Sequence, residues 1–527
     1  MPAAENGSST PRHDGRTAER AFFIVGVIAS AFYLAIGRRL WFHSDEWDFV
    51  AHRTAWDLSG LVRPHFYNWS TLPILVYRFL WWTVGLRSYL PYEALIVALH
   101  LLAAWLVLRV MRRAGVSPWI ATATALVLVL FGRGQQDILW PFQLTQVGSL
   151  VFGLTHLLLA DHDGPFERRD RLGLAAGLGG LMCSGVAVTM VIVVGIATLI
   201  RRGWRIAAVH TVPLGFVYLI WWSTMARFAY TTRGSSTWPG KAKFVVATIL
   251  NSLRGMGAFR GGAWLLVVLL VVGLVVAWRR LTWAEWSVRA AAPLSLLIGA
   301  GIFLGITALG RAALPGVTYR SRYLDLTLAM ILPALGVAAD ALIRRWHALT
   351  IPVVALLLIG IPANVRAIDT YTERADEIGD MYRHTVLSLA HSPRSRAVPA
   401  TLQPIPGITI GWLRAGAASG RIPGPGAVSS VEAATDAIRL SLYGGKAHRH
   451  DPAPCRSLVG LVTISLRANE SLRVARGVIQ VIPATGSFAG TYPATYVAGI
   501  VLRPVVPELT FRTKPADGAR QTEICLS

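Results

Sequence analysis

The chain contains the stretch AFFIVGVIASAFYLAIGRRLWFHSDEWD at residues 21–48, where an apolar run ends at two arginines and three acids follow closely. The apolar part approaches the length of about 20 residues that a helix needs to cross a bilayer. Carboxylates at the mouth of such a helix are costly to desolvate and often mark functional positions. We therefore predict a membrane-spanning helix followed by a functional acidic segment, His43–Asp48.

Composition extends this interpretation to the whole molecule. Of the 527 residues, 54% are hydrophobic and only 15% are charged, whereas a soluble protein carries about 25% charged residues. The run at 172–200 is too long for one span, and its Cys183-Ser184-Gly185 segment allows a break between two short helices. With that break the sequence predicts a polytopic α-helical membrane protein of about 11 transmembrane helices. The apolar runs lie near residues 21–38, 91–110, 117–131, 143–160, 172–200, 204–223, 263–278, 289–309, 323–343 and 349–365.

Basic residues predict the orientation of the chain. The net charge is +23, and nearly all of the basic residues are arginines. Alternate predicted spans end at arginine clusters, as expected for loops that stay in the cytoplasm. These clusters lie at residues 109–113, 167–171, 201–202, 279–280 and 344–345. We expect a multi-pass plasma-membrane protein with a cytoplasmic tail at 1–20, no cleavable signal peptide and no nucleic-acid partner.

The composition changes after the last predicted span. Residues 366–450 are mixed and charged, and from 456 onward short apolar runs alternate in the manner of strands. We predict an extracytoplasmic, mainly β domain at 366–527, built as a β-sandwich. A disulfide between Cys455 and Cys525 suits that compartment. The domain could bind a substrate of the protein or act as a lid or partner-docking domain, and the sequence leaves both readings open.

The outer segment at 41–90 contains a second kind of helix. Residues 71–84 are apolar, but Arg78 interrupts them and Trp69, Trp81 and Trp82 flank them. Aromatic residues of this kind anchor helices at the membrane surface. We predict an interfacial helix that lies beneath the acidic segment.

Asp45 and Glu46 are the leading catalytic candidates. Adjacent carboxylates cannot share one helical face, so one is expected to point to a reaction centre and the other to a supporting contact. Asp45 would act as the general base for an acceptor hydroxyl. The alternative is a solvated helix start in which Ser44 and Asp45 serve as N-caps.

The loop at 132–143 joins the third and fourth predicted spans and falls on the same side as Asp45. It is dense in amides, acids and aromatic rings, which are the groups that bind sugars. The alternative is an interfacial belt formed by Trp140 and Phe142. The substrate-binding candidates here are Gln136, Asp137, Trp140 and Gln143.

Three arginines in the loop at 310–323 fall on the predicted outer side, against the orientation rule. Arg311, Arg320 and Arg322 therefore need another explanation, and guanidinium groups at the bilayer surface suit a lipid phosphate. The alternative is contact with lipid headgroups by extended side chains. His65 in the first loop is expected to supplement this site.

Several common catalytic motifs are absent from the sequence. There is no Walker A segment, HExxH, CxxC pair or GxSxG, so nucleotide hydrolysis, zinc proteolysis and serine-hydrolase chemistry lack their usual residues. The energy for a reaction outside the membrane must then arrive in the substrate. An activated, lipid-linked sugar is such a substrate.

The arrangement over residues 20–365 resembles the GT-C superfamily of membrane glycosyltransferases. The similar branch uses polyprenyl-phosphate sugars and includes protein mannosyltransferases, aminoarabinose transferases and actinobacterial arabinofuranosyltransferases. One span is followed by Asp45-Glu46, by a surface helix that begins at His65 and runs through Leu72-Pro73, and later by a span that opens with Arg-Ser-Arg-Tyr-Leu at 320–324. One feature departs from the family, since related chains often carry Thr-Lys at the helix break where this chain reads Met-Cys-Ser-Gly-Val at 182–186.

The resemblance implies a GT-C-like catalytic domain at 21–365. Asp45 would be the catalytic base, with Glu46 beside it and Asp137 as a second acid of the outer cavity. A divalent metal bridging Asp45 and Asp137 is the alternative, but a monophosphate donor suits a metal-free reaction, so we expect no cofactor. Three residues are then placed near the lipid phosphate: Arg311, Arg320 and Arg322.

The predicted function is that of an inverting glycosyltransferase, which moves a sugar from a polyprenyl-phosphate donor to a hydroxyl of an envelope glycan, glycolipid or protein. Its partners are the donor, the acceptor and membrane lipids, and an arginine-rich, Ala/Gly-rich composition typical of actinobacteria favours arabinose or mannose. One alternative is a transporter or flippase for lipid-linked sugars, which needs charges deep inside spans and discontinuous helices. The other is a noncatalytic envelope-assembly protein that acts through its C-terminal domain.

Overall fold

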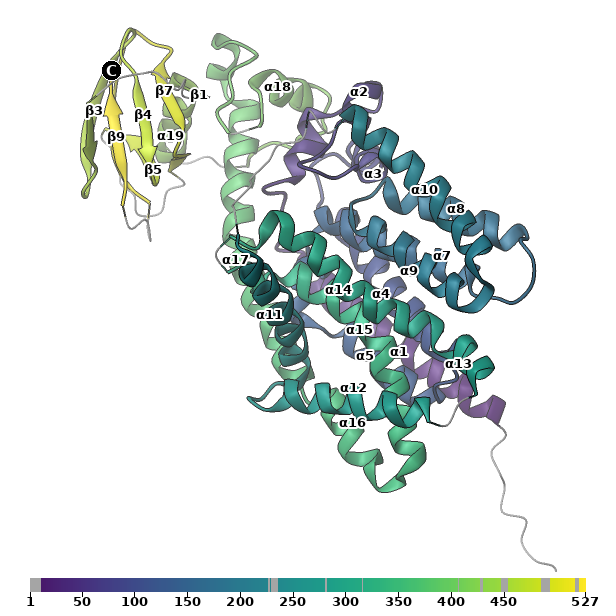
Figure 1. The fold of residues 1–527 in the computed structure, drawn as a ribbon. Coiled ribbons are helices and arrows are strands. Elements are labelled where there is room, and N and C mark those ends of the chain that lie inside the picture. Colours follow the sequence, from purple (N-terminus) through teal and green to yellow (C-terminus); the bar gives the residue numbers. More distant parts are fainter. Residues whose placement is uncertain are drawn as a thin grey trace, which may run out of the picture. The chain divides into compact units, whose positions relative to one another are not determined.

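The computed structural model describes most of the chain, which is largely helical with β-strands near the C-terminus (Figure 1). The described residues are 11–225, 228, 236–279, 282–314, 316–405, 407–426, 430–446, 454–484, 493–516 and 521–527. Residues 1–10 of the predicted cytoplasmic tail and Pro315 of the arginine-bearing loop lie outside them.

The chain divides into two compact units. The first contains Met1–Arg39, Thr54–Tyr77 and Leu90–Arg374. The second contains Leu40–Arg53, Arg78–Tyr89 and Ala375–Ser527. The second unit thus includes two short segments from the region that the sequence assigns to the catalytic domain, and the first of these holds the acidic segment.

The first unit is built from helices. Short helices and single turns connect the longer ones: α2 (Leu58–Val62), η2 (Gly132–Gly134), α6 (Gln135–Leu139), η3 (Pro141–Gln143), α13 (Trp283–Arg289), η5 (Val317–Tyr319) and η6 (His347–Leu349). Helices α3 (Thr71–Thr83) and α17 (Ile361–His391) cross the boundary between the units. The longer helices are α1 (Pro11–Gly37), α4 (Leu90–Arg113), α5 (Pro118–Val129), α7 (Leu144–Ala160), α8 (Arg168–Leu181), α9 (Val186–Arg202), α10 (Trp204–Met225), α11 (Trp238–Gly257), α12 (Gly262–Trp278), α14 (Ala291–Arg311), α15 (Ser321–Arg345) and α16 (Thr350–Leu358).

The helices are those of a multi-pass membrane protein. Within the described residues, 7 helical segments are long and apolar enough to cross a membrane, or up to 8 if the bent pair α11 and α12 forms one span. Helices α5 and α8, with 12 and 14 residues, are shorter than a typical spanning helix. This is one reason why the number of spans differs from the number of apolar runs in the sequence.

The break predicted in the 172–200 run is confirmed. Helix α8 ends at Leu181 and α9 begins at Val186. The backbone between them is bonded to the first loop, because Leu72 N–H donates to the Met182 carbonyl at 3.1 Å and Gly185 N–H donates to Asn68 Oδ1 at 2.9 Å. Irregular backbone among apolar helices is stable only when protein groups satisfy it in this way.

Helix α15 is the central helix of the first unit. It packs against α4, α5, α11, α12 and α14. Of its apolar 18-residue stretch, 83% is buried inside the protein. Arg344 and Arg345 lie in its last turn, where cations interact favourably with the helix dipole. The other end of α15 carries Arg322, so this predicted site residue begins the most enclosed helix of the membrane region.

The surface helix predicted from His65 starts later than expected. His65 and Asn68 instead exchange backbone hydrogen bonds in a tight turn, and Phe66 takes a left-handed φ of 51°. Helix α3 then runs from Thr71 to Thr83. This confirms the helix predicted at 71–84, whereas the start at His65 that the resemblance implied is wrong. A bulky residue with positive φ, such as Phe66, is unfavourable within a helix. The surface helix therefore begins only after this turn, at Thr71.

The second unit contains π-helical turn η1 (Asp48–His52), turn η7 (Pro393–Ala397), helices α18 (Ile410–Ala418) and α19 (Ser430–Ser441), and the strands. All strand pairings are antiparallel, in a five-stranded sheet of order β1-β7-β4-β9-β2 and a four-stranded sheet of order β3-β8-β5-β6. Both sheets contribute to one apolar core, as in a sandwich. The strands are β1 (Leu442–Lys446), β2 (Cys455–Ser457), β3 (Val462–Arg467), β4 (Leu472–Arg476), β5 (Val478–Pro483), β6 (Ala494–Val497), β7 (Ile500–Pro504), β8 (Glu508–Pro515) and β9 (Glu523–Leu526).

The predicted disulfide is present. Cys455 of β2 lies opposite Cys525 of β9, and the two sulfur atoms are bonded. Cys183 is a buried free thiol at the break between α8 and α9. The strands begin at Leu442, earlier than the alternating pattern from residue 456 indicated.

Candidate functional site

The acidic segment has an unusual backbone. Ser44, directly before Asp45, takes a left-handed φ of 55°, and Asp48–His52 forms a π-helical turn. A positive φ at a residue other than glycine costs about 1–3 kcal/mol, and π-helical turns occur frequently at functional sites. The local geometry therefore favours a functional role for this segment over an ordinary helix start.

Two of the three acids are bound to protein groups. The Glu46 carboxylate is fully buried, and it accepts hydrogen bonds from the His43 N–H at 3.0 Å and from the Tyr89 hydroxyl at 3.2 Å. Asp48 accepts from the Arg53 guanidinium at 2.9 Å. Glu46 thus supports the loop, and Asp48 forms an ion pair at the start of the π-helical turn.

Asp45 differs from its neighbours. Its side chain is half-buried, and its carboxylate has no hydrogen bond or ion pair with any described residue. His43 donates from Nδ1 to the Trp41 carbonyl at 3.1 Å, and burial lowers its pKa although Trp41 and the Asp45 charge oppose this. Asp45 is therefore the acid of this segment whose carboxylate is not bound to a described protein group.

Aromatic rings surround the acidic segment within the second unit. The Trp47 ring lies 5.9 Å from that of Tyr382 and 6.3 Å from that of Trp412, which stacks on Trp81 at 4.9 Å. Trp81 was one of the anchors predicted for the interfacial helix. These contacts pack the residue two positions after Asp45 against the rings of Tyr382 and Trp412.

In the first unit, three separate loops are joined by ring contacts. The Arg311 guanidinium lies over Phe66 at 5.9 Å, and the His65 ring lies 4.7 Å from Phe66 and 5.2 Å from Phe142. Trp140 and Phe142 are 5.2 Å apart. The structure therefore brings predicted residues of the first loop, the 132–143 loop and the 310–323 loop together, as the sequence-based site requires.

Asp137 and Asp325 form a buried acidic pair. Asp137 lies in the 132–143 loop, and Asp325 closely follows the 310–323 loop in sequence. Asp137 of α6 is fully buried, and burial raises its pKa well above the usual range. The charge of Asp325 on α15 raises this pKa further, whereas Arg322 lowers it. His100 Nδ1 lies 3.9 Å from Asp325 Oδ2. Arg322 and Asp137 are thus close enough to interact electrostatically.

Many polar groups around this pair lack a protein partner. Buried polar atoms in folded proteins are almost always hydrogen-bonded, so each exception needs an explanation. Gly134 packs tightly against the Asp325 carboxylate, which leaves no room for a side chain there. The buried atoms without a described hydrogen-bond partner include Gln136 Oε1, both Asp137 carboxylate oxygens, the Gln143 amide, Arg322 Nε and Asp325 Oδ1.

The predicted residues do not all join this group. Arg320 is exposed at the N-cap of α15, and no described contact links it to Asp137. Sequence reasoning missed Asp325, three residues after Arg322. The available signal was an acidic residue inside an apolar run, which is a functional position by default in a membrane span.

The described residues contain no group of three or more His, Cys, Asp or Glu side chains arranged to hold a metal ion.

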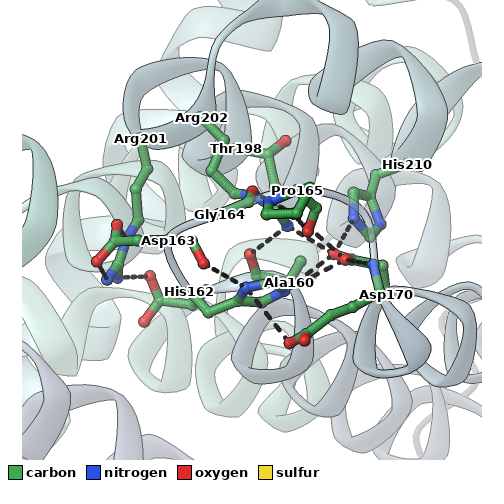
Figure 2. Close-up of polar contacts among 12 residues, drawn as sticks. Ala160, His162, Asp163, Gly164, Pro165, Asp170, Thr198, Arg201, Arg202 and His210 are labelled. Atoms are coloured by element: carbon green, nitrogen blue, oxygen red, sulfur yellow. Dashed lines mark hydrogen bonds and ion pairs between the residues drawn. The ribbon is translucent and has the colours of Figure 1, made fainter.

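A second polar network lies where α7 and α9 end and α8 and α10 begin (Figure 2). The buried Asp170 carboxylate accepts from Arg202, from His210 at 2.9 Å and from His162 at 3.2 Å. It also accepts from the Glu167 N–H at 2.8 Å and so closes the capping box of α8. Both Asp170 oxygens are bound to protein groups, so the buried centre of this network connects helix ends.

No protein-family model matches the chain, and no curated protein or solved structure matches it either.

Proposed function

We propose that the protein is an inverting GT-C-type glycosyltransferase that moves a sugar from a polyprenyl-phosphate donor to a hydroxyl of an envelope glycan, glycolipid or protein. The observation that carries this proposal is the group of buried carboxylate and amide atoms around Asp137 that have no described protein partner. A sugar supplies several hydroxyl groups that donate to such acceptors. Arg322 beside Asp137 adds a cation suited to the donor phosphate.

Asp45 is the proposed general base. Of the acidic segment, it is the carboxylate that the described protein leaves uncommitted, while Glu46 and Asp48 are held by Tyr89 and Arg53. Asp45 would take the proton of the acceptor hydroxyl as the oxygen attacks the anomeric carbon. The bond between that carbon and the phosphate oxygen breaks, and polyprenyl phosphate leaves with the bonding electron pair.

Arginines would stabilise the leaving phosphate. Arg311 and Arg322 are the candidates because both belong to the contact network of the first unit. Arg320, which is exposed, is assigned to the lipid headgroup region. His65, Gln136, Trp140 and Gln143 would bind the sugar through their rings and amides.

The proposed topology places residues 366–527 outside the membrane, with about 11 spans when the short helices are included. The Cys455–Cys525 disulfide supports this side, because disulfides persist in oxidising compartments outside the cytoplasm. Helices α4, α9 and α15 each end in two arginines. By the orientation rule, these ends belong on the cytoplasmic side in the proposed topology.

A transporter of lipid-linked sugars is the second candidate function. Glu93 and Asp325 are buried acids within candidate spans, and α11 and α12 meet at an angle of 103°. Charges inside spans and discontinuous helices are what a transporter needs. The uncommitted Asp45 favours the transferase, since carrying a substrate across the bilayer needs no general base.

Replacing Asp45 tests the proposal. Membranes containing the full chain would be assayed with a panel of radiolabelled polyprenyl-phosphate sugars, and the same proteoliposomes would be assayed for donor translocation. Asp45→Asn should lower sugar transfer by at least about 100-fold, the usual contribution of a general base. Asp57→Asn is the matched control, since Asp57 is an exposed acid in the same outer segment. Full transfer by Asp45→Asn would exclude the base assignment, and translocation without transfer in the wild type would favour the transporter.

Arg322→Ala tests the phosphate assignment. It should raise the donor concentration needed for half-maximal transfer much more than the acceptor concentration, because the guanidinium would bind the donor phosphate. The measurement is a paired titration of donor and acceptor. An unchanged donor titration would contradict phosphate binding by Arg322.

A further inference from the structure

A cavity of about 340 Å³ lies among helix ends of the first unit, away in sequence from the residues of the proposed transferase site. It is formed where α4, α12 and α15 end and where α13 leads into α14. Its volume is at the lower end of the range of about 300–1,000 Å³ that is usual for small-molecule sites. One wall is apolar, with Leu274, Ala277, Leu294 and Val337, and the cationic lining residues are Arg289 and Arg344.

Hydrogen bonds hold one side of the cavity in place. Asp340 accepts from the Ser117 N–H at 3.0 Å and from Arg344 at 2.7 Å, and Arg344 also donates to the Gly115 carbonyl at 2.8 Å. The turn between α4 and α5 is thereby fixed to the end of α15. A cavity with such a wall is formed before any ligand binds.

The acids that line the cavity are engaged, whereas one cation is not. Glu285 closes a capping box with Thr282, at 2.9 Å between its carboxylate and the threonine hydroxyl. Asp340 is bound to Ser117 and Arg344. Arg289, by contrast, has no hydrogen bond or salt bridge with any described residue; it interacts with the Glu285 charge only at longer range, and its side chain is exposed beside Gly115. The lining therefore presents a guanidinium whose N–H groups have no described hydrogen-bond acceptor, next to an apolar wall.

Two tryptophans also line this cavity. The rings of Trp278 and Trp286 are 4.8 Å apart in an edge-to-face arrangement. Tryptophan side chains are enriched at the level of lipid headgroups. The arginine-rich ends of α4 and α15, which the charge pattern assigns to the cytoplasmic side, lie at the same cavity. Anionic lipids are concentrated in the cytoplasmic leaflet.

We propose that this cavity binds an anionic lipid, with the phosphate group on Arg289 and the hydrocarbon chain along the apolar wall. A guanidinium can form two parallel hydrogen bonds to a phosphate group. The aliphatic side chains of the wall would contact the hydrocarbon chain of the lipid in place of neighbouring lipids. The site is independent of the proposed sugar transfer, since none of the transferase residues lines it.

Native mass spectrometry of the purified full chain tests the proposal. The protein in detergent is titrated with dioleoyl phosphatidylglycerol, with dioleoyl phosphatidylcholine and with inorganic phosphate. Arg289→Gln should weaken phosphatidylglycerol binding by about tenfold, as expected for the loss of charge-assisted hydrogen bonds. Ala341→Phe, which fills the cavity from α15, should weaken it as well. Arg171→Gln is the matched control, since Arg171 is exposed at the start of α8 and does not line the cavity.

Each outcome decides the proposal. Selective loss of phosphatidylglycerol binding in the Arg289 and Ala341 variants, with the control unchanged, supports it. Equal binding of phosphatidylcholine would show nonspecific lipid contact and overturn it. Inorganic phosphate that competes as well as the lipid would identify a site for the free anion and reject the lipid assignment. Thermal unfolding without added lipid verifies that each variant is folded.

Discussion

Asp170→Asn should destabilise the first unit more than any other single acid-to-amide change in the network of Figure 2. The carboxylate is fully buried and accepts from Arg202, His210, His162 and the Glu167 N–H. Asparagine keeps the shape but offers one acceptor oxygen, so the nearly buried Arg202 loses its counter-charge.

The magnitude follows from what Arg202 retains. Removing one partner of a buried ion pair costs about 3–5 kcal/mol. Arg202 still donates to the carbonyls of Ala160, Gly164 and Pro165, which partly satisfy its remaining N–H groups. We therefore expect a loss of about 3 kcal/mol, at the lower end of that range. Chemical unfolding in detergent micelles at neutral pH measures this value.

The same variant carries a pH signature. Burial raises the pKa of Asp170, but the hydrogen bonds from Arg202, Glu167 and His210 outweigh it and hold the pKa well below the usual value of 3.8. A folded-state pKa below the unfolded value stabilises the protein above that unfolded value, and the stabilisation is lost as the pH falls through the folded pKa. The stability difference between wild type and Asp170→Asn should therefore be constant near neutral pH and shrink below pH 3.8.

Asp163→Asn is the matched control for this experiment. Asp163 pairs with Arg201 at 3.0 Å, but its side chain is 74% exposed. Exposed ion pairs contribute about 0–1 kcal/mol, so this variant should unfold almost like the wild type. Equal stability of the Asp170 and Asp163 variants would refute the reasoning that burial gives the network its strength.

Two further predictions concern stability. Cys525→Ser should lower the unfolding free energy of the sandwich by about 4 kcal/mol, because the bond to Cys455 closes a separation of 70 residues, and full-chain unfolding with and without reductant measures this. Retention of wild-type stability by the reduced protein would argue against it. Gly132→Ala should destabilise the first unit by about 2 kcal/mol or more, because its Cβ would lie 1.7 Å from the Asn364 carbonyl oxygen. Gly301→Ala, which meets nothing within 4 Å, should leave the melting temperature unchanged or raise it, and similar behaviour of the two variants would contradict the packing argument.

Local patterns in the sequence predicted much of the fold. The apolar helices, the break after Leu181 and the alternating strands each depend on neighbouring residues, and the structure contains all three. The sequence made a Cys455–Cys525 disulfide plausible, because both cysteines lie in the polar C-terminal region, but only the structure shows that they pair. The predicted start of the surface helix at His65 was wrong, because the turn at His65–Asn68 depends on backbone hydrogen bonds that no apolar pattern reveals.

The candidate site was only partly predictable. Glu46 was placed beside Asp45 in catalysis, yet its partner Tyr89 lies 43 residues away, and only the folded chain reveals this contact. Asp325 was overlooked because it follows the more conspicuous arginines. Its closeness to Gly134 joins two segments about 190 residues apart in sequence, a separation that local patterns cannot encode.

The strand order of the five-stranded sheet has a consequence for biogenesis. Strand β9 lies between β4 and β2, and both neighbours are translated earlier. Until residues 523–526 have been synthesised, β4 and β2 each present an unpaired edge, which is a site for pairing with other chains. The sandwich therefore completes its sheet only after translation of β9, and truncation just before this strand should yield an aggregation-prone domain rather than a slightly shortened, stable one.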